Sequence, residues 1–224
     1  MDIEVNETGE HAPGTAAQRV GRRALLGAGF GGAALSLLPL LSGRASASTP
    51  PTSDAAEAAP TTTAAPLRPT EEDVTLLGDA QRAELAAVTL FDQAIAKGGW
   101  SDVQLTVVSN LREAHNAYAN ALSGLLGRQA PGTASDAVVA LYTDGFNGAS
   151  AGDMLDAAYE LESALVATHT EILGSLAGTN GASLLASIQV NEARHGTVLA
   201  DLNEKSDPAD LLVDKEADSL VGKV

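Results

Sequence analysis

Apolar side chains recur at alternating spacings of three and four residues in four stretches of the chain, the spacing that places them on one face of an α-helix. In the last stretch, residues 184–202, Leu185 and Leu199 mark such a face, and Glu192 and His195 interrupt it in the middle. A carboxylate and an imidazole are costly to bury on a hydrophobic face unless other groups pair with them or a ligand lies between them. The pattern therefore predicts polar partners on the other helices.

Capping residues and glycines mark where the helices begin and end. Thr70 and Ser101 are the predicted N-caps of the first two helices, because acids or a glutamine follow each of them in the first helical turn. Gly98 and Gly127 are the predicted stops. The predicted helices cover residues 71–97, 102–126, 153–176 and 184–202. The tail over 205–224 is acidic and weakly patterned, and we expect it to be mobile or loosely docked.

The first three helices carry the same kinds of polar residue on their apolar faces. Glu84 lies on the face of the first helix, His115 on that of the second, and Glu162 and His169 on that of the third. His11, the first of the four histidines, lies near the N-terminus, whereas the other three occupy core-facing positions. That concentration is hard to attribute to chance.

The two halves of the helical region repeat one another. Glu84 precedes His115 by 31 residues, and Glu162 precedes His195 by 33. The residue seven positions after the first glutamate is large in both halves, Phe91 in one and His169 in the other. Helix pairs that repeat in this way predict two halves facing a shared centre, where the polar side chains converge.

These features together predict the fold class. A long connection over 127–152, with a short helix near 135–143, separates the second long helix from the third, as a bundle with a crossover requires. Aromatic residues make up only 3% of the chain, which favours helices packed through small aliphatic side chains. The prediction is an all-α, antiparallel four-helix bundle with a long crossover between helices two and three, over residues 70–204.

Charge and cysteine content exclude several kinds of function. The net charge is −16, and residues 1–47 hold four acids and four bases, so the remainder carries 9 − 25 = −16. Nucleic-acid binding depends on lysine and arginine, so this balance argues against it. Without cysteine there is no disulfide and no thiolate ligand, so any metal must be bound by nitrogen and oxygen.

The N-terminal region resembles a twin-arginine signal peptide. Arg22 and Arg23 precede an apolar run that ends at Leu41, and a small-x-small cleavage site follows at residues 45–47. Residues 1–47 are therefore the predicted signal and residues 48–69, rich in proline, threonine and alanine, a disordered linker. The predicted location is the periplasm, the cell envelope or the medium. The alternative is a retained membrane anchor.

The core-facing polar residues resemble the ligands of the ferritin-like carboxylate superfamily. The pattern comprises a glutamate on helices one and three, a histidine on helix two and Glu192-x-x-His195 on helix four, and it spans about residues 71–203. The segment 188–199 (IQVNEARHGTVL) is similar to the exported, bacterioferritin-related or desiccation-associated branch.

The resemblance implies a pair of iron or manganese ions between the helices. Glu84 and Glu162 would then be terminal carboxylates, Glu192 a bridging carboxylate, and His115 and His195 the nitrogen ligands. The implied role is iron handling or oxidative stress defence, and a metal-dependent oxidase or peroxidase-like activity is left open. Metal ions are the expected partners, with a homodimer as an open alternative.

One position departs from the family pattern. Arg112 stands three residues before His115, where a second bridging acid is expected. Its guanidinium could pair with the buried glutamates and take the place of a metal, whereas His169 could serve as a packing group, as a group behind the ligands or as an extra nitrogen donor. The centre is thus expected to hold two metals, one or none. The second hypothesis is a metal-free bundle with a structural or binding role in the cell envelope.

Overall fold

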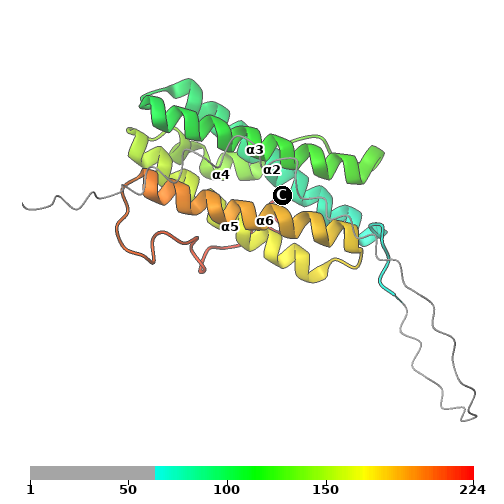
Figure 1. The fold of residues 1–224 in the computed structure, drawn as a ribbon. Coiled ribbons are helices and arrows are strands. Elements are labelled where there is room, and N and C mark those ends of the chain that lie inside the picture. Colours follow the sequence, from blue (N-terminus) through cyan, green and yellow to red (C-terminus); the bar gives the residue numbers. More distant parts are fainter. Residues whose placement is uncertain (1–63) are drawn as a thin grey trace, which may run out of the picture. The chain divides into compact units, whose positions relative to one another are not determined.

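The computed structural model describes residues 64–224, and every regular element in this part of the chain is helical (Figure 1). The all-α prediction is confirmed. The predicted signal peptide and most of the predicted linker lie outside the described residues. The elements are α2 (Glu71–Lys97), α3 (Asp102–Leu126), the short 3-10 helix η2 (Gly127–Gln129), α4 (Asp136–Phe146), α5 (Ala151–Ser175) and α6 (Thr179–Leu202). None of the described helices is long and apolar enough to cross a lipid bilayer.

Capping boxes begin three of the four long helices, including the two predicted from sequence. At the start of α2, Asp73 N donates to Thr70 Oγ1 (3.2 Å) and Thr70 N donates to Asp73 Oδ2 (2.8 Å). The same carboxylate accepts hydrogen bonds from the backbone N–H groups of Ala177 and Gly178, in the turn between α5 and α6. Burial opposes ionisation of Asp73, but these N–H donors hold its pKa below the usual value. Asp73 thereby joins the two halves of the bundle at one end.

The long helices form two antiparallel hairpins, α2 with α3 and α5 with α6, which pack face to face (Figure 1). The α4 helix of the crossover packs against α2 and α5. Two hydrophobic clusters fill the space between the hairpins. The larger includes Leu90, Phe91, Leu111, Leu161 and Leu199, and the smaller includes Leu77, Leu122, Ile172, Leu185 and Ile188. On α3 and α6, the predicted polar residues lie between the positions that supply these two clusters.

The predicted start of the fourth long helix was wrong. The predicted helix began at residue 184, whereas α6 already begins at Thr179. A Cβ atom added at Gly181 would lie 2.9 Å from Leu77 Cδ1. Because Gly181 has no side chain, α6 and α2 can approach each other closely at this position, which lies within the helix.

The acidic tail is packed more closely than we expected. Leu220 is 1% exposed and belongs to the larger hydrophobic cluster. Its backbone N–H donates to Thr168 Oγ1 (2.8 Å), and the N–H of Asp214 donates to Ser163 Oγ (3.0 Å). Hydroxyl groups on α5 thus satisfy backbone groups of the tail, and a buried leucine holds it in place.

Candidate metal centre

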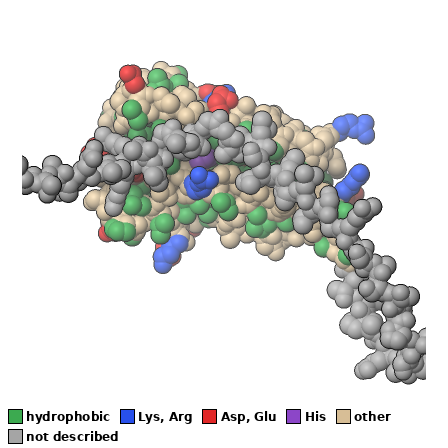
Figure 2. Space-filling view, in the orientation of Figure 1, with side chains coloured by type: hydrophobic (Ala, Val, Ile, Leu, Met, Phe, Trp, Pro, Cys, Tyr) green, Lys and Arg blue, Asp and Glu red, His purple; other side chains and the backbone are tan. Residues whose placement is uncertain are grey.

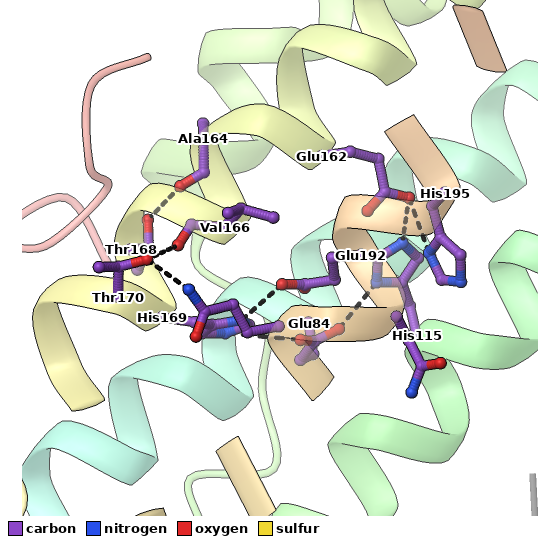
Figure 3. A network of polar contacts seen from close by, with 12 residues as sticks. Glu84, His115, Glu162, Ala164, Val166, Thr168, His169, Thr170, Glu192 and His195 are labelled. Atoms are coloured by element: carbon purple, nitrogen blue, oxygen red, sulfur yellow. Dashed lines mark hydrogen bonds and ion pairs between the residues drawn. The ribbon is translucent and has the colours of Figure 1, made fainter. Parts of the chain in front are cut away.

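Six ionisable side chains converge between the two hydrophobic clusters (Figure 3). All are buried, and they come from all four long helices: Glu84 from α2, His115 from α3, Glu162 and His169 from α5, and Glu192 and His195 from α6. The structure therefore brings the five predicted ligands together and adds His169 to them. The ligand atoms of His115, Glu162 and His195 lie within 4.8 Å of one another, and so do those of Glu84, His115 and Glu192.

His115 lies between two carboxylates. Its Nδ1 is 2.8 Å from Glu84 Oε2 and its Nε2 is 3.0 Å from Glu162 Oε1. Burial would lower the pKa of His115, but the Glu162 and Glu84 carboxylates raise it well above its usual value. An imidazolium that donates from both ring nitrogens satisfies this geometry, so His115 carries a positive charge into the centre.

Glu162 is the carboxylate that the histidines stabilise. Its Oε1 is 3.0 Å from His115 Nε2 and 3.2 Å from His195 Nδ1. Burial disfavours the ionised form, yet the charges and hydrogen bonds of His195 and His115 lower the pKa of Glu162 to about 2. Glu162 therefore remains ionised near neutral pH.

Glu84 and Glu192 are at the other end of the centre with His169 (Figure 3). His169 Nδ1 is 2.7 Å from Glu192 Oε2, and His169 Nε2 is 3.5 Å from Glu84 Oε1. Burial, together with the charge of Glu192, raises the pKa of Glu84 to about 7. Burial and the charge of Glu162 raise the pKa of Glu192 to about 8. Burial is the largest cause of both shifts and outweighs the nearby histidines, so it favours the protonated form of these two glutamates near neutral pH.

Four buried atoms of the centre have no hydrogen-bond partner among the described residues: Glu84 Oε1, Glu162 Oε2, His169 Nε2 and Glu192 Oε1. Leaving such an atom unsatisfied costs about 1–3 kcal/mol, and more if it is charged. Three of the four are carboxylate oxygens and the fourth is an imidazole nitrogen, the donor types that bind iron and manganese. The residues present therefore fit a metal centre.

His195 lies at the edge of the centre. It is 5% exposed, whereas His115 and His169 are fully buried, and Figure 2 shows histidine atoms at the surface of one face. Tyr118 covers it on the α3 side, with the two rings stacked at 6.1 Å and 17°. The sequence analysis gave Tyr118 no role at the centre, although its position one turn after His115 was a signal that it would border the centre.

Arg112 does not enter the centre. Its Nε and Nη2 donate to Asp92 Oδ1 (2.9 Å) and Oδ2 (3.1 Å), and its Nη1 donates to Glu113 Oε1 (2.9 Å). Both of these acids are exposed. The hypothesis that Arg112 fills the pocket and pairs with the buried glutamates is therefore wrong. A paired guanidinium at the surface keeps its hydration, which burial would remove.

The fold agrees with a comparison against known families. A family model described as ferritin-like domain matches residues 72–205, more than half of the chain. The protein belongs to the ferritin-like domain family. Searches of curated proteins and of solved structures gave no significant match.

Proposed function

We propose that this ferritin-like bundle binds iron or manganese between its helices and acts in iron handling or oxidative stress defence. The five sequence-predicted residues would hold the metal: Glu84, His115, Glu162, Glu192 and His195. The observation that carries the proposal is the set of four unsatisfied buried donor atoms, two of which, His169 Nε2 and Glu84 Oε1, lie 3.5 Å apart. A cation would satisfy them together.

The donor set supports these metals on chemical grounds. Carboxylates stabilise harder, higher oxidation states, imidazoles supply neutral donors that suit iron, and thiolates are absent from the chain. When bound, iron or manganese would supply redox chemistry toward dioxygen or peroxide. The protein holds the ligands in place through the two hydrophobic clusters, which also exclude water.

The buried side chains also hold protons that a metal would displace. Glu84 and Glu192 have pKa values raised to about 7 and about 8, and the pKa of His115 is raised well above its usual value. Metal ligands must be deprotonated, so binding releases these protons. The centre therefore takes up a metal in exchange for protons.

A metal-free bundle with a structural or binding role in the cell envelope is the second candidate. The position of His115 favours it, because its ring contacts carboxylates on both sides and can itself supply positive charge. In that case the histidine, and not Arg112, takes the place of the metal.

Metal content separates these two functions. The full-length chain, produced with added iron or manganese, should contain a stoichiometric amount of one of them by elemental analysis, and its melting temperature should rise by about 5 °C or more when that metal is added. Glu192→Gln should lose metal, whereas Glu171→Gln, an exposed change on α5, should keep it. Less than a few tenths of an equivalent of any transition metal, with an unchanged melting temperature, would refute metal binding.

We also propose that the chain is exported by the twin-arginine pathway. The proposal rests on Arg22, Arg23 and the apolar run that follows. Cell fractionation should find the mature chain outside the cytoplasm, and the double change Arg22→Lys, Arg23→Lys should retain it inside. Equal export of the variant would contradict this route.

A further inference from the structure

His169 differs from its counterpart in the other half of the repeat. Phe91 follows Glu84 by seven residues, as His169 follows Glu162, and Phe91 packs its ring on His115 at 5.4 Å and 20°. An aromatic hydrocarbon is therefore sufficient for packing at this position of the repeat. His169 is fully buried, so its two ring nitrogens carry a desolvation cost that packing alone does not require.

One ring nitrogen of His169 is oriented by a carboxylate. Its Nδ1 lies 2.7 Å from Glu192 Oε2. Once Glu192 is deprotonated, as metal binding requires, its carboxylate only accepts hydrogen bonds, so Nδ1 carries the hydrogen and Nε2 keeps a free lone pair. Metal-binding histidines are typically held in this way, with the second nitrogen donating to a carboxylate.

The other ring nitrogen faces an unsatisfied oxygen. His169 Nε2 lies 3.5 Å from Glu84 Oε1, and neither atom has a hydrogen-bond partner among the described residues. With Glu84 deprotonated as well, two lone pairs face each other in a buried site and repel, and a cation between them would reverse the interaction. Two ligand atoms bound to one ion at about 2.1 Å lie roughly 3.0–3.5 Å apart, so the spacing suits a shared ion.

We propose that His169 is a metal ligand through Nε2 and shares one ion with Glu84, while Glu192 holds its ring through Nδ1, beside a second subsite of His115, Glu162 and His195. This inference rests on the proposed function. It assigns the centre three carboxylates and three imidazoles, where the family pattern has four carboxylates and two imidazoles. Because imidazole is neutral, the exchange favours the divalent state of the metal.

Binding of Co(II) alone to the full-length, metal-free chain tests this assignment, with visible absorption and stoichiometry as readouts. We expect His169→Gln to lose one equivalent of Co(II) or to weaken one subsite by at least about tenfold, with a changed ligand-field spectrum. Arg112→Gln is the matched control, because its side chain pairs with Asp92 outside the centre. It should bind Co(II) as the parent chain does.

The outcomes distinguish the inference from the function on which it rests. If the parent chain binds Co(II) and His169→Gln gives the same stoichiometry, affinity and spectrum, His169 is not a ligand, although the metal function stands. If the parent chain binds no cobalt, iron or manganese, both are overturned. Far-UV circular dichroism of the metal-free His169→Gln variant shows whether it folds. If it does not, His169→Phe replaces it in the test, because phenylalanine is the residue at the equivalent position, Phe91, in the other half of the repeat.

Discussion

Glu162 Oε1 contacts two histidines at once, His115 Nε2 at 3.0 Å and His195 Nδ1 at 3.2 Å, while the other oxygen of this carboxylate is unsatisfied. At the scale of single residues, this α5 carboxylate connects ionisable side chains of α3 and α6. The sequence predicted Glu162 from the helical spacing of apolar residues alone. The sequence did not predict where the guanidinium of Arg112 lies. Periodicity places the Cβ atom of a residue on one face of a helix, but it does not place the end of a long, flexible side chain.

Replacing Glu162 tests its importance for the metal-free fold. Glu162→Ala leaves two buried imidazoles without their shared carboxylate, so we expect a loss of about 3–5 kcal/mol in the free energy of unfolding, measured with urea. Glu160→Gln, an exposed change two residues away on α5, is the control and should stay within about 0.5 kcal/mol of the parent. A loss as small as that of the control would mean that Glu162 is not paired as described.

The raised pKa values predict how the metal-free protein responds to pH. Burial raises the pKa of Glu84 to about 7 and of Glu192 to about 8, and the glutamates around His115 raise its pKa well above the usual value. A group whose folded pKa is raised stabilises the fold at low pH, and this contribution is lost as pH rises through the folded pKa. The lowered pKa of Glu162, about 2, acts in the opposite direction, but only below about pH 5.

The metal-free melting temperature should therefore fall between about pH 5 and pH 8, from just above the usual pKa of a glutamate to the raised values of Glu84 and Glu192. Circular dichroism across this range measures it, and saturating metal should reduce the slope because a bound cation replaces the protons. The double change Glu84→Gln, Glu192→Gln should also flatten the dependence. A melting temperature that is constant or rises over this window would show that these carboxyl groups are not protonated in the core.

At the scale of helices, capping residues decided how well the boundaries could be predicted. The spans that follow Thr70 and Ser101 were predicted with the bounds that the structure has, because a capping box is a local signal. The start of α6 was missed because its N-cap is Gly178, which makes no side-chain cap, and because Gly181 faces Leu77 within the helix. Sequence cannot distinguish a glycine that ends a helix from one that allows two helices to approach.

Gly178 supplies a test at this scale. A Cβ atom there would lie 2.7 Å from the backbone oxygen of Arg68 and 2.9 Å from Asp73 Oδ2, so Gly178→Ala must displace the chain before α2 or its cap. We expect a loss of about 1–3 kcal/mol in urea unfolding. Gly174→Ala on α5 has nothing within 4 Å and should be neutral or stabilise by up to about 1 kcal/mol. Equal effects of the two changes would contradict this packing.

At the scale of the described domain, the tail completes the bundle. The docking of the tail could not be predicted from its sequence, because the tail has a high density of acids and its single buried leucine forms no helical pattern. The position of the tail depends on hydrogen bonds to the hydroxyl groups of Ser163 and Thr168. Nothing in the sequence of α5 indicates that these two hydroxyl groups bind another segment. Long-range contacts of this kind leave no periodic signal in either segment.

Leu220 tests whether the tail is part of the fold. Leu220→Ala removes a leucine that is 1% exposed, and we expect it to cost about 2–5 kcal/mol in the free energy of unfolding. Leu212→Ala, in the same tail but 65% exposed, should cost less than about 0.5 kcal/mol. Indistinguishable unfolding midpoints for the two variants would show that the tail is not docked.

The central claim is that the buried glutamates and histidines form a metal centre that exchanges protons for a cation. Anaerobic calorimetric titration of the metal-free, full-length chain with ferrous iron, in two buffers of different ionisation enthalpy, tests it most directly. We predict saturable binding with proton release at pH 7, because Glu84, Glu192 and His115 hold protons before the metal binds. Absence of saturable binding of both ferrous and manganous ions would contradict the account.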